Sequence, residues 1–304
     1  NKKLFPTPKT MLKQLSEMGF HVNLWEHAFV CNSSLMYEKL KDYSANYTVW
    51  KGLVPDFSSA AARDVFCAHH KELVNYGYID GYKLDECDSS DYTGGWSFPD
   101  CSEFPSGLDG EQYHCLLGTL YMQTMMQALD GKQTYSEVRN AGALNASYPF
   151  VLYSDLYDHR DFVRGMCTAG FSGLLWTPEV RHAESKEEFL RRLQTTVFSC
   201  QCLINGWYSE EFPWLKFDCE EDVKKLIELR VKLIPMLSAA FNEYATSGKP
   251  PIRALVSDYT DDEQVYNIDD EYIFCDRIIV APIIVGEKRR KVYLPKGKWI
   301  DYFT

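Results

Sequence analysis

Apolar and polar residues recur along the first 215 positions with two periods, one typical of helices and one typical of strands. Residues 8–18 place apolar side chains every three to four positions, between Thr7-Pro8 and Gly19, which predicts an amphipathic helix with a marked start and end. Residues 58–77 repeat this arrangement, and residues 185–198 open with the Ser185 and Glu188 spacing of a capping box. Short apolar runs predict strands at 21–30, 80–85, 135–141, 149–155, 172–179 and 202–207.

Helices that alternate with strands predict β/α units and a parallel sheet, so the fold class is α/β. The two candidate architectures are an open doubly wound sheet and part of a TIM (β/α)8 barrel. No strand is followed by G-x-G-x-x-G or G-x-x-x-x-G-K-S/T, so the nucleotide-binding form of the open sheet has no support. Polar side chains recur where the strands end, which favours the barrel. Six strands are two short of closure, and we expect either two hidden strands or an absent N-terminal part.

A long helix predicted at residues 220–248, with Pro235 expected to kink it, ends the alternating pattern. Beyond it, residues 251–256, 271–285 and 291–304 read as strands without helices between them. The sequence therefore predicts a barrel domain over residues 1–248, and the start of an all-β sandwich domain over residues 249–304.

The net charge of −11 narrows the classes of partner. Without any run of Lys or Arg, this charge argues against nucleic acid or an anionic membrane surface, and a neutral or basic small substrate suits it better. No stretch reaches the roughly 18 apolar residues of a membrane-spanning helix. The ten cysteines lack zinc-like spacing, so reduced and mostly buried thiols are expected.

A cluster of acidic residues directly follows the strand predicted at residues 80–85. It contains Asp85, Glu86, Asp88 and Asp91. Three explanations compete: a solvated loop, a divalent cation site, or a catalytic carboxylate at the mouth of a barrel. The cation site has least support, because the spacing lacks the pattern and the distal Glu of a calcium loop. Alternation along the strand puts Lys83 and Asp85 on one face, and Leu84 and Glu86 on the other.

A second apolar strand also ends in an acid, Asp155, with Tyr153 on the same face two residues earlier. Carboxylates at the ends of two barrel strands can point across one pocket. That geometry serves glycoside hydrolysis, in which one carboxylate attacks the anomeric carbon and a second donates a proton to the leaving oxygen. Asp158 and Asp161 follow closely, but they fall at the predicted start of a helix and read as helix-start residues.

Sugar sites also need flat apolar faces and planar hydrogen-bond donors. Residues of these kinds stand at the ends of the strand candidates: Trp25, His27, Arg139, Trp176, Glu179, Arg181 and Trp207. Each alone is more often a core or surface residue. Their recurrence at strand after strand favours a carbohydrate pocket.

The chain resembles glycoside hydrolase family 31, the retaining exo-acting α-glycosidases, in the order of six segments: residues 18–30, 54–70, 76–88, 138–155, 167–180 and 276–304. The resemblance covers nearly the whole chain and is most specific at residues 276–304, where D-x-x-x-V-A-P precedes V-Y-L-P-x-G-x-W-x-D. It implies Asp85 as the nucleophile, Asp155 as the acid/base, and Arg139 as the residue that holds the sugar next to the cleaved bond. Lys83 also occurs in related α-galactoside-cleaving barrels. The resemblance further implies a preceding β-sandwich and two barrel strands, and hence a fragment of a longer polypeptide.

Two segments depart from the family pattern where the sugar would be read. The acid/base lies in YSDLYDHRDF where α-glucosidases have Gly-Asp-Asn, and TPEVRHAES, with Glu179 and Arg181, replaces an Asp-Ile-Gly-Gly tract. With the FPSGLDGEQYH loop, these segments resemble members that act on galacto-configured or N-acetylated sugars. The expected activity is hydrolysis of terminal α-linked sugars with retention, without a metal or organic cofactor. The alternatives are an α-transglycosylase, a non-catalytic carbohydrate-binding member and a metal-dependent hydrolase.

Overall fold

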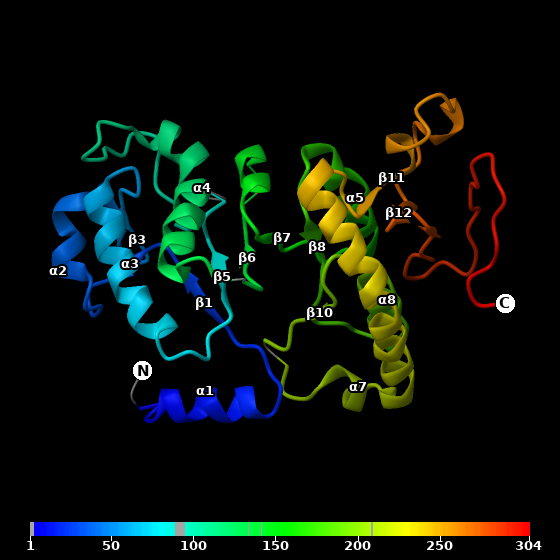
Figure 1. Cartoon of the computed structure of the whole chain (residues 1–304), viewed down its shortest axis with the longest axis horizontal. Coiled ribbons are helices and arrows are strands. Elements are labelled where there is room, and N and C mark those ends of the chain that lie inside the picture. Colours follow the sequence, from blue (N-terminus) through cyan, green and yellow to red (C-terminus); the bar gives the residue numbers. More distant parts are fainter. Residues whose placement is uncertain (1–2, 89–94, 133, 141, 208) are drawn as a thin grey trace. The chain divides into compact units, whose positions relative to one another are not determined.

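The computed structural model describes residues 3–88, 95–132, 134–140, 142–207 and 209–304. The chain forms two compact units, Asn1–Leu152 and Tyr153–Thr304. Each unit has its own packed elements (Figure 1). The predicted domain boundary at residues 248 and 249 is a different division of the chain and stays a prediction.

A parallel sheet forms the centre of the first unit. Within this unit its strands are β1 (Asn23–His27), β5 (Gly81–Asp85), β6 (Glu137–Val138) and the first two residues of β7 (Val151–Tyr153), in the order β1-β5-β6-β7, while Tyr153 belongs to the second unit. In register, Trp25 lies opposite Lys83, His27 opposite Asp85, and Lys83 opposite Glu137. The predicted parallel sheet of β/α units is confirmed.

The two faces of this sheet have different surroundings. Helices α3 (Ala60–Val74) and α4 (Gly110–Leu129) pack side by side near β1 and β5 (Figure 1). On the helix side, the Glu26 carboxylate accepts hydrogen bonds from His70 of α3 and Tyr121 of α4. Because neighbouring positions of a strand point to opposite faces, the other face carries Trp25, His27, Lys83 and Asp85. The predicted shared face of Lys83 and Asp85 is confirmed.

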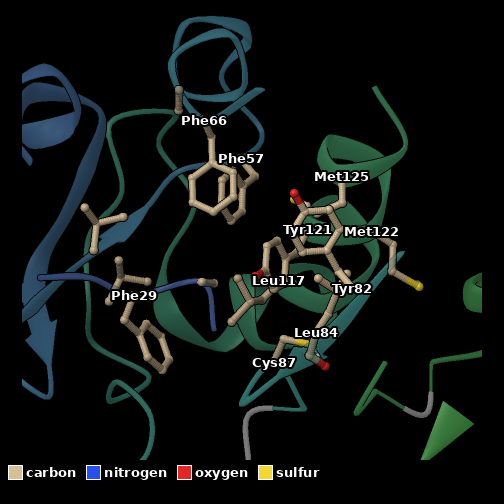
Figure 2. Close-up of a cluster of buried hydrophobic side chains, with 14 of the residues drawn as sticks. Phe29, Phe57, Phe66, Tyr82, Leu84, Cys87, Leu117, Tyr121, Met122 and Met125 are labelled. Carbon is tan, nitrogen blue, oxygen red and sulfur yellow. Dashed lines mark hydrogen bonds between the residues drawn. The ribbon is translucent and has the colours of Figure 1, made fainter. Parts of the chain in front are cut away.

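The core of the first unit lies between the sheet and these helices (Figure 2). The rings of Phe57 and Tyr121 stack with centroids 5.6 Å apart, and Phe66 meets Phe57 edge-on at 5.0 Å. Leu84 and Met125 are fully buried in the same cluster. Burying one side chain of this size contributes about 1.5–3 kcal/mol, so the cluster fixes β5, and with it the acidic strand end, against the helices.

The remaining elements of the first unit flank this sheet. They are α1 (Pro8–Glu17), β2 (Val30–Cys31), α2 (Tyr37–Leu40), η1 (Lys41–Tyr43), β3 (Ser44–Val49), β4 (Gly52–Pro55) and η3 (Ala143–Ser147). Helix α1 ends at Glu17, two residues before the predicted terminator Gly19, whose φ of +88° is readily adopted only by glycine, and the Phe20 amide donates back to the Leu15 carbonyl. Strands β2, β4 and β3 form an antiparallel sheet in which Trp50 and Lys51 make the hairpin turn.

The second unit is mainly helical up to residue 247. It contains α5 (His159–Ala169), η4 (Gly170–Ser172), β8 (Trp176–Thr177), β9 (Glu179–Val180), α6 (Lys186–Val197), β10 (Leu203–Ile204), α7 (Pro213–Lys216) and α8 (Glu220–Ser247). Strands β9 and β10 pair in parallel, and α6 packs against α8. Ser185 caps α6 as predicted, but the Glu188 carboxylate accepts from the Glu184 amide rather than from Ser185, so half of the capping box forms. Helix α8 continues through Pro235.

The C-terminal part of this unit contains a small antiparallel sheet, in the order β11 (Ile252–Ala254), β12 (Tyr272–Phe274) and β13 (Ile278–Val280). Two predictions for this region are wrong. Two 3₁₀ helices, η5 (Leu255–Ser257) and η6 (Glu263–Val265), stand between β11 and β12. Residues 291–304, all of them described, form no strand. Pro295 lacks a backbone donor, and its carbonyl instead accepts from Trp299 Nε1 at 2.8 Å across a turn.

All ten cysteines have free thiols, and six of them are buried. Burial raises the pKa of Cys167, Cys200 and Cys275 to about 12, so these thiols stay protonated and unreactive at neutral pH. The predicted reduced and mostly buried thiols are confirmed. Among the residues described, no helix has the length and apolar character needed to span a bilayer.

Candidate active site

Asp85, the last residue of β5, has a carboxylate held by donors from three segments. Its Oδ2 accepts a hydrogen bond from Trp25 Nε1 of the neighbouring strand at 2.7 Å, and its Oδ1 accepts from the Glu86 amide at 2.8 Å. Arg139 Nε lies 3.2 Å from Oδ1 as an ion pair. Asp85 is only 8% exposed, so these donors, rather than bulk water, stabilise its negative charge.

Arg139 directly follows β6, and its amide donates to the Leu84 carbonyl at 2.9 Å. The buried guanidinium pairs with the carboxylates of Asp85, Glu86 and Asp88, with 3.3 Å between Nε and Asp88 Oδ2. Residues 85–88 are therefore no solvated loop, because three acids share one buried cation. Asp91 lies outside the described residues. Among the described residues, no group of three or more His, Cys, Asp or Glu side chains is arranged to hold a metal ion.

Glu86 lies where the strand pattern did not place it. Alternation put its side chain on the face opposite Asp85, but its φ of +55° lies in the left-handed region and its buried carboxylate pairs with the same arginine as Asp85. That backbone conformation costs on the order of 1–3 kcal/mol for a residue other than glycine and is concentrated at functional sites. No period along the strand signals it.

A row of aromatic rings extends from Asp85. Trp25, half exposed, meets His27 at a centroid distance of 5.3 Å, His27 meets Trp50 at 5.0 Å, and Trp50 meets Trp96 at 5.2 Å. Burial lowers the pKa of His27 more than the Glu26 and Asp85 carboxylates raise it, so the imidazole is neutral at pH 7. Trp50 and Trp96 were not among the predicted site residues. Trp50 reaches this row because it sits in the turn between β3 and β4, where its φ is +50°.

In the second unit, Asp155 follows β7 and is exposed. Its Oδ1 accepts a hydrogen bond from the Tyr157 hydroxyl at 2.7 Å, and the Tyr157 oxygen accepts one from Arg181 Nη1. The guanidinium carbon of Arg181 stands 4.9 Å from the centroid of the Tyr157 ring and 5.8 Å from that of Trp207. The predicted residues Asp155 and Arg181 thus lie together, joined by Tyr157, which sequence reasoning missed.

Glu179 on β9 forms a hydrogen-bonded pair with Asn205. Both of its carboxylate oxygens accept from Asn205 Nδ2 at 3.2 Å, and Glu179 is 3% exposed. Asn205 follows β10, which pairs with β9, and its Oδ1 accepts from the Trp207 amide at 2.9 Å. Asn205 therefore couples Glu179 to the segment that carries Trp207.

Two predicted binding residues of this unit are deeply buried. Tyr153 is 1% exposed and Trp176 is 5% exposed. The Trp176 indole donates to Ser154 Oγ at 2.9 Å and packs so closely on Gly165 of α5 that a Cβ there would lie 2.8 Å from the ring. Its position is that of a core residue, and a role in binding stays a prediction. Asp158 caps α5, accepting from two amides of the first turn, as expected for a helix-start residue.

The structure thus gathers the predicted residues into two groups. Trp25, His27, Lys83, Asp85 and Arg139 lie on or beside one face of the β1-β5-β6 sheet, and Asp155 and Arg181 share a hydrogen-bonded chain in the other unit. A single pocket that uses both carboxylates stays a prediction.

Comparisons with known proteins agree with the family resemblance found in the sequence. The family model described as the glycosyl hydrolases family 31 TIM-barrel domain matches residues 1–240, and that of the family 31 C-terminal domain matches residues 248–304. Alpha-glucosidase 2 of Bacillus thermoamyloliquefaciens is 32% identical over 63% of the chain and 26% of its own length. The isomaltosyltransferase of Sporosarcina globispora is 30% identical over 98% of the chain and 32% of its own length.

Among solved structures, a cycloalternan-degrading enzyme from Trueperella pyogenes in complex with cycloalternan superposes with a TM-score of 0.85 at 20% identity, over 98% of this chain and 46% of that one. The likeness extends the match from sequence to fold. The chain spans about a quarter to a half of the length of these proteins. With one family's two domain models matching nearly the whole chain in order, the chain belongs to glycosyl hydrolase family 31.

Proposed function

We propose that the chain carries the catalytic residues of a retaining exo-α-glycosidase that removes terminal α-linked sugars from oligosaccharides or glycoconjugates. The observation that carries this proposal is the Asp85 carboxylate, fixed at the end of β5 by Trp25, the Glu86 amide and Arg139. A nucleophile of this type must be held in one orientation before the sugar arrives, and these three contacts support that role.

In the proposed reaction, Asp85 attacks the anomeric carbon while Asp155 gives its proton to the leaving oxygen, which breaks the glycosidic bond and leaves a glycosyl ester on Asp85. Asp155, now a carboxylate, takes a proton from water as the water oxygen attacks the anomeric carbon and releases Asp85. Two inversions give net retention. The mechanism requires the two carboxyl groups to stand about 5–5.5 Å apart, and a separation near 9 Å would favour inversion.

We propose that the remaining residues bind the sugar. The half-exposed indole of Trp25 offers a flat face beside the nucleophile, and Lys83 shares its sheet face. His27 Nδ1 accepts from the Phe29 amide, so the neutral ring offers Nε2–H as a donor, and Arg139 is held rigidly enough to orient a hydroxyl. Four further residues complete the proposed set of sugar-binding residues: Tyr153, Trp176, Glu179 and Arg181. Trp176 acts through the packing of α5.

We expect the segments around Asp155 and Glu179 to influence which sugar is bound. A glucoside is the expectation for the family, and the relative named Alpha-glucosidase 2 agrees with it. The departures from the α-glucosidase pattern in these two segments favour a galacto-configured or N-acetylgalactosaminide substrate.

The experiment offers 4-nitrophenyl α-glycosides of glucose, xylose, galactose and N-acetylgalactosamine to the full-length protein. One sugar should be cleaved well ahead of the others, and Asp85→Asn should reduce kcat/KM about a thousandfold or more. Asp64→Asn, an exposed acid of α3, is the matched control and should leave the rate unchanged. Cleavage that survives in Asp85→Asn would remove Asp85 as the nucleophile. Loss of activity on adding a chelator would favour the metal-dependent alternative.

A second candidate function is transglycosylation, because the isomaltosyltransferase relative covers 98% of the chain. The covalent intermediate on Asp85 would be the same, and a sugar hydroxyl would replace water as the acceptor. Product analysis with and without an added free sugar separates the two activities, since a transglycosylase forms a new disaccharide as the main product. If none of the four glycosides is cleaved, the non-catalytic carbohydrate-binding alternative is favoured.

A further inference from the structure

We propose that Tyr157 is a positioning residue for the acid/base step, donating its hydroxyl proton to Asp155 in a hydrogen bond whose direction Arg181 fixes. The inference rests on the proposed role of Asp155. It assigns a task to a residue that neither the strand pattern nor the family resemblance singled out.

The direction of the hydrogen bonds follows from the chemistry of the three groups. A guanidinium has only donors, so in the Arg181 to Tyr157 contact the phenol oxygen must accept. The single hydroxyl proton of Tyr157 is then committed to Asp155 Oδ1, 2.7 Å away. Since Oδ1 already accepts this bond, the proton of the acid form of Asp155 belongs on Oδ2. The chain of bonds therefore selects which carboxylate oxygen delivers the proton.

The phenol is held in place from several sides. The guanidinium of Arg181 lies over the Tyr157 ring and also contacts the ring of Trp207. The next residue, Asp158, is fixed as the N-cap of α5 by the amides of Arg160 and Asp161. Tyr157 thus sits between a capped helix start and a stacked arginine, which limits the movement of its hydroxyl.

Tyr157 remains a donor across the working range of a glycosidase. Burial raises its pKa, the hydrogen bond to Asp155 raises it further, and Arg181 only partly offsets this. The charged groups near this chain include Glu179 beside Arg181, and Asp158 and Arg192 beside Tyr157. His159, the first residue of α5, is kept neutral by burial, which lowers its pKa to about 4, so it does not titrate in the neutral or alkaline range.

The consequence concerns the second half of the reaction. Once Asp155 has given its proton to the leaving oxygen, the bond from Tyr157 becomes charge-assisted and about twice as strong. It therefore stabilises the carboxylate that must next take a proton from water. Without the phenol, this support for the second step is lost, and the pH profile of kcat/KM changes on its alkaline limb.

The test is the pH dependence of kcat/KM for Tyr157→Phe in the full-length protein, with the 4-nitrophenyl α-glycoside that the panel selects. We expect the alkaline limb of this profile to move to higher pH, because the Asp155 side chain loses one charge-assisted hydrogen bond. Tyr266→Phe is the matched control, since it removes an exposed hydroxyl of the same unit that donates to the Thr260 carbonyl. Its profile should superpose on that of the unmodified protein.

A double-variant cycle shows whether Tyr157 acts through Asp155. In the Asp155→Gly protein, adding Tyr157→Phe should change the rate less than twofold. A Tyr157→Phe profile that is lower at every pH with an unmoved alkaline limb would overturn the inference and leave Tyr157 a structural residue. Azide tests the underlying function separately. If azide fails to restore cleavage of the 4-nitrophenyl substrate by Asp155→Gly, the acid/base assignment falls, and the inference falls with it.

Discussion

A single imidazole, that of His159 in α5, should make the stability of the protein fall in mild acid. The ring is 4% exposed, and both of its nitrogens are bonded. Nδ1 accepts from the Val285 amide at 3.2 Å. Nε2 lies 2.9 Å from Thr195 Oγ1, whose own proton goes to the Arg191 carbonyl, so the hydroxyl oxygen accepts from Nε2–H. A second proton on the ring would point Nδ1–H at the Val285 N–H.

The magnitude follows from the pKa of the ring. Burial, together with the positive charge of Arg192, lowers the pKa of His159 from 6.5 to about 4, although Asp158 partly opposes this. Between these two values the unfolded chain binds a proton that the folded protein refuses, so the free energy of unfolding decreases as the pH falls. The loss is about 1 kcal/mol near pH 5.5 and about 3 kcal/mol near pH 4, and it vanishes above about pH 7.5.

The assay is equilibrium unfolding in urea from about pH 4 to 8, for the unmodified protein and His159→Gln. The variant should be the less stable of the two at neutral pH, because it loses packing and hydrogen bonds, and this gap should shrink by about 3 kcal/mol toward pH 4. His182→Gln, which replaces an imidazole with 62% exposure, is the control for replacing a histidine in the same unit. A gap between His159→Gln and the unmodified protein that stays constant with pH would refute the reasoning.

Two further predictions concern other buried groups. Burial alone lowers the pKa of His70, but the Glu26 carboxylate raises it more, so the pair stabilises the fold below the unfolded pKa near 6.5 and loses this effect as the pH rises through the higher folded value. His70→Gln should therefore cost most stability in mild acid, and a urea-unfolding deficit that grows toward pH 9 would contradict this. Gly165→Ala would place a Cβ 2.8 Å from the Trp176 ring, and this overpacking should cost about 1–3 kcal/mol in thermal unfolding. Gly206→Ala, where a Cβ meets nothing within 4 Å, should cost clearly less, and equal costs would show that the Trp176 contact is not the cause.

The strand pattern predicted which side chains share a face because alternation is a property of the local backbone. Lys83 and Asp85 lie together on one face of β5, and Glu26 on β1 points to the helices, as the period requires. The prediction of a strand failed at residues 291–304, which form none. A strand needs a partner to pair with, and Pro295 instead directs its carbonyl into a turn with Trp299.

The candidate site residues also divide into those that a local pattern predicted and those that it did not. Asp85 and Asp155 could be found because each ends an apolar run, where a parallel sheet exposes its strand ends. Trp50 gave no such signal, since it reaches the aromatic row only through the hairpin of β3 and β4. Tyr157 gave none either, because its importance depends on an arginine 24 positions away.

The sequence by itself thus determined the β/α order, the faces of β1 and β5, and the two strand-end carboxylates, all of which follow from periods of two and 3.6 residues that are written locally in the chain. The tertiary structure decided what surrounds those carboxylates. Glu86 turns toward Arg139 through a left-handed backbone conformation, and Tyr157 is aimed at Asp155 by Arg181. Such contacts join residues from separate segments, and their direction is set by packing and charge rather than by any local period.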